Sequence, residues 1–339
     1  MRILVGISGG VDSAVTTYLL KKQGFEVIGL YMKMHKGVNH KENLSKIDKL
    51  SKLIGFKYYI EDVEDEFRKK VYDYFVESYK EGATPNPCAM CNTHIKFGIF
   101  MQFLEKYSCQ KAATGHYVRC DGKFLYEAKD KSKDQSYFLF GIKKEVLPKI
   151  LFPLGEYSKE EIKEIAKEIG LEEFASQKES QDICFIETTY IDVLKNHFNP
   201  EIPGRVVDKR GKKIGTHKGY AFYTIGQRKG FRLFKSHKPQ YVLGIDAKKN
   251  ILIVGDKEEL ERKQVFLKGV NLFIDGKVFE CEAKVRYKAP KLPAVVKMES
   301  KSKAVVNFKQ KPIGVAKGQA CVFYDGEKLL GGGWIRGAK

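Results

Sequence analysis

The sequence has no long apolar run, and only 10 of its 339 residues are proline. A helix that crosses a membrane needs about 18 or more consecutive apolar residues, and disordered or fibrous chains are usually rich in proline and glycine. Both classes are therefore disfavoured. With 43% hydrophobic residues, we expect a globular protein with a substantial core, located in the cytoplasm and without a membrane partner.

Cysteine pairs are also scarce. The seven cysteines are an odd number, and Cys88 and Cys91 form the only CxxC pair. A disulfide scaffold usually has an even number of cysteines, and a zinc site of the four-cysteine type needs a second pair. We therefore predict no metal ion and expect thiol chemistry at Cys88, Cys91 and Cys184. The other cysteines lie in apolar or strand-like contexts and are expected to be small core residues, namely Cys109, Cys120, Cys281 and Cys321.

An iron–sulfur cluster is the alternative for the same three thiols. Thiolates at CxxC spacing also bind such clusters, so Cys88, Cys91 and Cys184 could hold one with an open iron position. The sequence alone leaves both uses of the cysteines open.

Positive charge is concentrated in the second part of the chain. The net charge of the whole sequence is +19, but residues 1–200 carry only +1 whereas residues 201–339 carry +18. A generally lysine-rich surface would not leave the first 200 residues neutral. A segment of this kind is typical of a protein that lies along a polyanion, and we predict a nucleic-acid partner.

The beginning of the chain contains a glycine-rich loop. An apolar strand leads into Ser8, two glycines, a valine, Asp12 and Ser13. Adjacent glycines let backbone N–H groups surround an anion, and the start of the following helix attracts negative charge. The lysine of a Walker loop is missing. The pattern predicts a phosphate-binding loop in which Asp12 or Ser13 caps a helix that starts near Ala14.

Strands and helices alternate after this loop. We predict strands at residues 27–32, 57–60 and 111–114, and helices at residues 14–22, 42–54, 64–80 and 93–107. This alternation indicates an α/β fold with a parallel sheet, whose ligands lie at the carboxyl ends of the strands. Met32 and Gly115 fall at such ends. Further along, we predict a hairpin around Asp121 and Gly122 and a capping box from Ser158 to Glu161.

The pattern changes in the last third of the chain. From about residue 203 onward, short β-like runs alternate with turns, and two small β-rich modules fit this pattern. We therefore predict three domains. They are an α/β phosphate-loop domain at residues 1–197, a small β-rich central domain at residues 198–259 and a C-terminal β-barrel at residues 260–339.

Cys91 follows a proline-rich segment. Pro85 and Pro87 fix their own backbone angles and favour extended geometry in the residues before them, so residues 84–92 should form a rigid loop that ends where a helix begins. A thiol near a helix N-terminus has a lowered pKa. We therefore predict that Cys91 is an acidic, nucleophilic thiol.

Seven motifs occur in one order along the chain. They are residues 8–13, 84–92, 114–117, 134–139, 182–186, 224–230 and 331–333. Together they closely resemble the motifs of the bacterial tRNA-specific 2-thiouridylases, which place sulfur on C2 of the wobble uridine of tRNA. The resemblance spans essentially the whole chain. It departs at Cys88, where many relatives have aspartate, and at residues 179–182.

The resemblance implies a role for individual residues. Cys91 would be the nucleophile and Cys184 the persulfide carrier, and the two would end each turnover as a disulfide. ATP with Mg²⁺ would be contacted by Gly6, Ile7, Ser8, Gly9, Gly10, Val11, Asp12, Ser13, Met32 and Gly115. Asn86, Pro87 and Cys88 would face the target base, and tRNA would be contacted by His116, Lys133, Asp134, Gln135, Arg286, Tyr287 and Gln319. The partners would be tRNA of the Lys, Glu and Gln type and a persulfide donor protein, and we expect a monomer.

Two other functions fit parts of the sequence. An ATP pyrophosphatase that acts on a small molecule would use the same loop, but it would need neither a persulfide nor a basic C-terminal part. A non-catalytic tRNA-binding iron–sulfur protein would use the basic part and the cysteines. Binding of tRNA would distinguish the predicted thiolase from the small-molecule pyrophosphatase. Release of AMP that depends on tRNA would distinguish it from the non-catalytic tRNA-binding protein.

Overall fold

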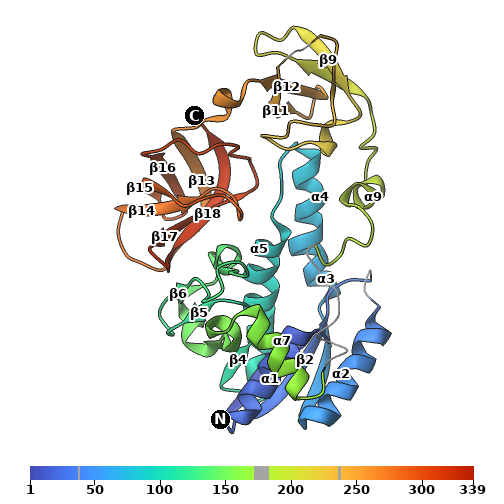
Figure 1. Ribbon diagram of the computed structural model, residues 1–339, viewed down its shortest axis with the longest axis vertical. Helices are drawn as coiled ribbons and strands as arrows, with labels where there is room; N and C mark the ends of the chain where they lie inside the picture. Colours follow the sequence, from blue (N-terminus) through green and yellow to red (C-terminus); the bar gives the residue numbers. More distant parts are fainter. Residues whose placement is uncertain (37–38, 172–182, 236–237) are drawn as a thin grey trace. The chain divides into compact units, whose positions relative to one another are not determined.

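The computed structural model describes residues 1–36, 39–171, 183–235 and 238–339 (Figure 1). The chain forms two compact units that are interleaved along the sequence. The first unit comprises Met1–Val71, Cys88–Phe185 and Gly326–Leu330, and the second comprises Tyr72–Pro87, Ile186–Asp325 and Gly331–Lys339. The domain boundaries at 197/198 and 259/260 stay predictions, and residues 179–182 lie outside the described part of the chain.

The first unit contains the predicted parallel sheet. Its strand order is β3-β2-β1-β4-β7, and the four neighbouring pairs are all parallel. The strands are β1 (Arg2–Gly6), β2 (Glu26–Lys33), β3 (Lys57–Asp62), β4 (Lys111–Ala113) and β7 (Ile150–Leu151). The α/β prediction is therefore confirmed.

Helices cover both faces of this sheet. Alternate residues of β1 point to opposite sides, and the apolar side chains on each side pack against a different helix. Ile3 and Val5 pack in one cluster with Val15 of α1 (Val11–Lys22). Leu4 packs in another cluster with Phe100, the first residue of α6 (Phe100–Lys106). Full burial of such a side chain contributes about 1.5–3 kcal/mol relative to leaving it exposed. The two clusters hold β1, and the loop that follows it, between two layers of helices.

Local signals determine several helix ends. Gly55 ends α2 (His40–Ile54) with a φ of 75°, a left-handed conformation that glycine adopts without strain. The predicted capping box is present at α7 (Lys159–Glu168), where Ser158 and Glu161 bond to each other's backbone N–H groups. The short helices of the same unit are η3 (Ser136–Leu139), η4 (Lys144–Lys149) and η5 (Pro153–Glu156).

Two predicted continuous helices are interrupted by π-helical turns. The helix predicted at 64–80 consists of α3 (Glu64–Phe67), η1 (Arg68–Tyr72) and α4 (Asp73–Lys80). The helix predicted at 93–107 begins earlier and consists of α5 (Pro87–Cys91), η2 (Asn92–Ile99) and α6. A π turn adds one residue to a helical turn and needs no glycine, proline or polar residue at that place, so the sequence pattern did not reveal it. Such turns occur frequently at functional sites.

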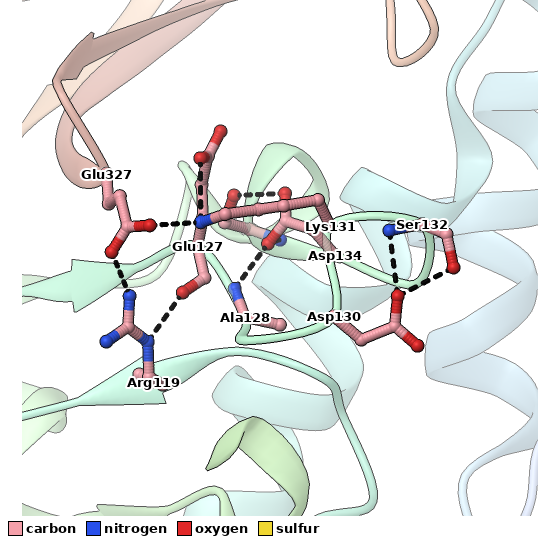
Figure 2. Close-up of polar contacts among 9 residues, drawn as sticks. Arg119, Glu127, Ala128, Asp130, Lys131, Ser132, Asp134 and Glu327 are labelled. Atoms are coloured by element: carbon pink, nitrogen blue, oxygen red, sulfur yellow. Dashed lines mark hydrogen bonds and ion pairs between the residues drawn. The ribbon is translucent and has the colours of Figure 1, made fainter. Parts of the chain in front are cut away.

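The end of the chain returns to the first unit. Lys328 and Leu329, at the start of β18 (Lys328–Ala338), pair with β6 (Leu125–Tyr126), which forms the predicted hairpin with β5 (Arg119–Cys120). Figure 2 shows that the Glu327 carboxylate accepts from both Arg119 and Lys131. The Glu127 N–H group donates to the Glu327 carbonyl oxygen at 2.9 Å. Residues 326–330 therefore complete the first unit.

The second unit is rich in β-strands, as predicted, and most neighbouring strands in it are antiparallel. One sheet has the order β10-β9-β8-β12-β11. The other strands form a six-stranded barrel, β13-β16-β15-β14-β17-β18, which closes because β13 also pairs with β18 (Figure 1). The elements of this unit are α9 (Tyr190–Lys195), β8 (Gly204–Val207), β9 (Lys213–His217), η6 (Tyr220–Phe222), β10 (Arg232–Leu233), β11 (Tyr241–Asp246), β12 (Ile251–Gly255), η7 (Lys257–Leu260), β13 (Gln264–Leu272), β14 (Val278–Lys284), β15 (Leu292–Ser300), β16 (Lys303–Phe308) and β17 (Ala320–Asp325). Within the described ranges, no helix has the length and apolar character of a membrane span.

Candidate active site

The glycine-rich loop connects β1 to α1 at the carboxyl edge of the sheet. Gly9 has a φ of 81°, and Gly10 is the N-cap of α1. The prediction that Asp12 or Ser13 caps this helix is wrong, because α1 already begins at Val11 and the Ser13 hydroxyl donates back to the Gly10 carbonyl at 2.9 Å. In the part of the chain that is described, no side chain caps α1. Its first N–H groups can therefore bind the oxygens of a phosphate.

Asp12 is held by two donors from distant parts of the sequence. Its Oδ1 atom accepts from the Tyr117 hydroxyl at 2.8 Å and from Lys159 Nζ at 2.7 Å. Gly115 lies against the backbone of Asp12, and a Cβ atom at Gly115 would come within 3.0–3.1 Å of Asp12 atoms. Any larger residue at 115 would push the two segments apart. The close approach of β4 to the loop therefore needs this glycine.

A cavity of about 400 Å³ opens beside the loop. Its size is in the range of small-molecule sites. Of the residues predicted to contact ATP, it is lined by Gly6, Ile7, Ser8, Asp12, Ser13, Met32 and Gly115, whereas Gly9, Gly10 and Val11 are not among the lining residues. Lys96 is the one cationic side chain, and Asp12 the one carboxylate, among the described residues that line it.

His116 and Gln135 also line this cavity, although both were predicted to contact tRNA. His116 is 7% exposed, and its two ring nitrogens pair with Thr114 Oγ1 at 2.8 Å and with Asn92 Oδ1 at 3.2 Å. Burial holds the pKa of His116 well below its usual value, and the charge of Lys96 lowers it further. The imidazole is therefore neutral at pH 7.

The first unit contains all three cysteines of the predicted thiol group. Cys88 and Cys184 are exposed, whereas Cys91 is only 7% exposed. Burial raises the pKa of Cys91 to about 12, and the charges of Cys184 and Cys88 oppose its ionisation further. The prediction of an acidic Cys91 is therefore wrong. Because the helix begins at Pro87, Cys91 is its fifth residue, and desolvation outweighs the helix dipole.

Lys96 is the cation that the three thiols share. Its charge lowers the pKa of Cys88, Cys91 and Cys184, although in each case desolvation of the sulfur raises the pKa more. Cys88 and Cys184 are exposed as whole residues, but protein atoms around their sulfur atoms desolvate the thiolate and so raise the pKa. Lys96 follows Cys91 by five residues across η2, where Phe100 N–H bonds to the Ile95 carbonyl five residues back. A hydrogen bond of this five-residue spacing is typical of a π turn.

The described residues contain no group of three or more histidine, cysteine, aspartate or glutamate side chains arranged to hold a metal ion. The alternative of an iron–sulfur cluster on Cys88, Cys91 and Cys184 therefore gains no support from their arrangement.

Comparisons with known proteins match the chain over nearly its full length. Three family models match in succession, namely the tRNA methyl transferase HUP domain at residues 1–188, the tRNA methyl transferase PRC-barrel domain at residues 191–256 and the aminomethyltransferase β-barrel domain at residues 262–335. The tRNA-specific 2-thiouridylase MnmA of a Nitratiruptor species is 54% identical over 336 residues, which cover 98% of this chain and 99% of that protein. The chain belongs to the tRNA-specific 2-thiouridylase family. A second relative of the same name, from Campylobacter curvus, is 52% identical and covers 99% of this chain and 100% of its own length.

Solved structures resemble this 2-thiouridylase family member only distantly. The U34-tRNA thiolase NcsA from Methanococcus maripaludis, solved with its [4Fe-4S] cluster, has 19% identity and a TM-score of 0.37, and the match covers 58% of this chain and 63% of NcsA. A 4-thiouridine synthetase in complex with RNA and ATP has 18% identity and a TM-score of 0.35, and covers 52% and 42%. At these identities and TM-scores the likeness is too distant to assign a function.

In this member of the 2-thiouridylase family, several residues predicted to contact tRNA bond within the protein. Asp134 is 5% exposed, and its oxygens accept from the N–H groups of Ala128 and Ser136 at 3.0 and 3.2 Å and from the Ser136 hydroxyl at 2.8 Å. Gln135 and Tyr117 bond twice, since each backbone N–H group donates to the other residue, both times at 2.9 Å. The Lys133 N–H donates to the Asp130 carbonyl at 3.2 Å. These bonds fix the loop at residues 127–136, and Figure 2 shows the bond from the Ala128 N–H group to Asp134.

The second unit holds the other predicted contacts. The Gln319 amide donates to the carbonyl oxygens of Thr84 and Pro85, both at 3.0 Å, and so anchors the segment that leads to Asn86 and Pro87. The Arg286 guanidinium donates to the Ile225 carbonyl at 2.6 Å. Lys284 Nζ lies 5.8 Å from the centre of the Tyr287 ring. Gln319 and Arg286 thus both bond to backbone carbonyl groups of loops.

Neither Lys96 nor Lys159 was among the residues predicted for the site. Lys96 could have been considered, because it follows Cys91 within one helix and is the first cation after it. Lys159 gave no such signal, since its contact with Asp12 joins residues that are 147 positions apart.

We expect iodoacetamide to alkylate Cys184 and Cys88 before Cys91. With a pKa of about 12, roughly one Cys91 side chain in 10⁵ is a thiolate at pH 7, and each further pH unit should raise its alkylation rate about tenfold. Mass spectrometry of peptides after timed labelling measures each rate, and the fully buried Cys321 serves as an unreactive control. Rapid labelling of Cys91 at pH 7 that does not increase above pH 8 would contradict the raised pKa.

Proposed function

We propose that the protein catalyses the ATP-dependent 2-thiolation of the wobble uridine of tRNA. The observation that carries the proposal is the full-length match to relatives named tRNA-specific 2-thiouridylase. It is supported by the first unit, which holds both a phosphate loop and three electrostatically coupled thiols. The basic second part of the chain is suited to an RNA substrate.

The first step of the proposed reaction is activation of the uridine. The oxygen at C2 is a poor leaving group, and transfer of AMP to it with release of pyrophosphate makes it a good one. The uncapped start of α1 and the loop around Ser8 would bind the phosphates, and Lys96 would attract them into the cavity. Mg²⁺ that accompanies ATP supplies positive charge to the phosphates, and Asp12 is the carboxylate of the described cavity lining that could contact it.

The second step is sulfur transfer. The outer sulfur of a Cys184 persulfide attacks C2, the C2–O bond breaks and AMP leaves with that oxygen. The Cys91 thiolate then attacks Cys184 Sγ, which breaks the S–S bond and leaves its electron pair on the sulfur attached to C2. The base keeps the sulfur as a thiocarbonyl, and Cys91 and Cys184 form a disulfide that a thiol reductant opens. A persulfide donor protein would reload Cys184.

In this reaction Lys96 would offset part of the desolvation that raises the pKa of Cys91. An ammonium group near the three sulfur atoms favours whichever of them is an anion, first the persulfide and then the Cys91 thiolate. His116 is neutral and adds no second positive charge, so Lys96 would be the cation that stabilises these anions. Cys88 would only border the base.

Purified protein provides the test. We expect it to convert a tRNA transcript with a wobble uridine into the 2-thiouridine form when Mg²⁺, ATP and a persulfide donor are supplied. Mass spectrometry of the digested nucleosides would detect one 2-thiouridine for each AMP released. The matched control is the same transcript with cytidine at the wobble position, which should release no AMP. Equal AMP release with the control, or with no RNA, would overturn the proposal.

A further inference from the structure

The phosphate loop poses an electrostatic problem. No lysine or arginine occurs in residues 3–20, so the loop has no cation of the kind that a Walker loop supplies. It also presents the Asp12 carboxylate to the cavity in which the phosphates of ATP would lie. An unpaired carboxylate there would repel the triphosphate, and this repulsion is strong where water is partly excluded.

Lys159 is placed to remove this repulsion. Its residue is 3% exposed, and its ammonium group lies 2.7 Å from Asp12 Oδ1 and 5.5 Å from the centre of the Tyr117 ring. Lys159 is not among the residues that line the cavity. Lys159 would therefore act on a bound ligand by neutralising Asp12 and not by touching the ligand itself.

The backbone around Lys159 is fixed at several points. Lys159 is the first residue of α7, whose start is set by the capping box of Ser158 and Glu161. The Lys159 N–H group donates to Asp130 Oδ2 at 3.1 Å. The second partner of Asp12, Tyr117, is held by its two hydrogen bonds with Gln135. Both donors to Asp12 are thus anchored by the loop at residues 127–136.

We propose that Lys159 is a positioning residue of the nucleotide site, which fixes the Asp12 carboxylate and neutralises it so that the loop can accept the phosphates of ATP. A buried lysine loses its hydration and most of its side-chain freedom, and both losses disfavour burial. Lys159 is buried nevertheless, and its ion pair is with a residue that lines the cavity. The inference rests on the proposed use of ATP. It does not depend on which RNA, or which sulfur donor, the protein uses.

The pair can be tested by removing its charges singly and together. We expect Lys159→Met to weaken ATP binding at least about tenfold, because it leaves Asp12 charged and unneutralised next to the phosphates. With Mg²⁺ left out, Asp12→Asn alone should bind ATP at least as tightly as wild type, because the repelling carboxylate is gone while Lys159 keeps its charge. The double variant should recover most of the affinity lost in Lys159→Met, because the repelling charge is gone. Calorimetric titration of the full-length protein with ATP and a chelator in place of Mg²⁺, without RNA, measures all four affinities and leaves any Asp12–Mg²⁺ contact out of the comparison.

The outcomes separate positioning from simple stabilisation. Lys129→Met is the matched control, since Lys129 pairs with Glu161 at 3.2 Å in the same unit but is half exposed, and it should leave ATP affinity unchanged. Thermal melting would show that each variant is folded. Wild-type affinity in folded Lys159→Met would overturn the inference, and so would a double variant that binds as weakly as Lys159→Met. If the wild-type protein binds ATP but does not thiolate tRNA, the proposed function fails while this inference stands.

Discussion

Serine in place of either Cys91 or Cys184 should abolish thiolation, with a loss of at least about 10³-fold, whereas Cys88→Ser should retain most of the wild-type rate. In the proposed reaction Cys184 carries the transferred sulfur and Cys91 breaks the S–S bond, so neither thiol can be replaced by a hydroxyl group. In that reaction Cys88 would only border the base. The measurement is the rate of 2-thiouridine formation with excess persulfide and ATP.

The two inactive variants should fail at different steps. Cys91→Ser should stop after the attack on C2 and accumulate an RNA–protein adduct through Cys184, which a thiol reductant splits to release thiolated RNA. Cys184→Ser should form no adduct. A denaturing gel run with and without reductant distinguishes them.

An iron–sulfur mechanism makes the opposite prediction for Cys88. If Cys88, Cys91 and Cys184 hold a cluster, Cys88→Ser should be as damaging as the other two variants, and the active protein should be coloured and depend on iron. Loss of activity in Cys88→Ser together with iron-dependent turnover would therefore refute the persulfide mechanism.

The affinity of the full-length protein for tRNA should fall at least about 10³-fold between 50 and 200 mM salt. A protein that makes about six or more phosphate contacts releases a corresponding number of counterions, and this gives such a steep dependence. The +18 charge of residues 201–339 supplies enough cations. Fluorescence titration of labelled tRNA at several salt concentrations measures the slope, and an affinity that does not change with salt would contradict an electrostatic interface.

Two lysines of the barrel are candidates for this interface. Lys268 of β13 lies directly opposite Lys303 of β16, and both are exposed. Like charges in this position destabilise a sheet, and a bound phosphate would relieve the repulsion. We expect Lys268→Gln with Lys303→Gln to reduce the salt slope by about two. The matched control replaces Lys309 and Lys311, which already pair with Glu280 and Glu261, and should change the slope less.

The sequence predicted the first unit well wherever structure depends on nearby residues. The parallel sheet, the hairpin at Asp121 and the capping box at Ser158 follow from apolar periodicity, turn residues and side chains a few positions apart. The phosphate loop was located for the same reason. Its cap was not, because the Ser13 hydroxyl bonds back to Gly10 and Asp12 bonds to residues more than 100 positions away.

The acidity of Cys91 was mispredicted for a different reason. The helix dipole can be inferred from a sequence, but burial cannot, and at Cys91 burial has the larger effect on the pKa. The π turns on either side of the thiol region were missed because they insert a residue without changing which side chains are apolar. Lys159 shows the same limit, since a buried ion pair between distant segments leaves no local pattern.

The return of residues 326–330 to the first unit has a consequence for how the protein is made. On a ribosome this segment emerges only after residues 186–325, and until then Arg119, Lys131 and β6 have no partner at Glu327–Leu329. At about 5–20 residues per second, the roughly 140 residues between 185 and 326 take about 7–30 s to synthesise. The first unit is therefore completed only after residues 186–325 have been made, and a chain that terminates before residue 326 would lack the last segment of the unit that contains the phosphate loop.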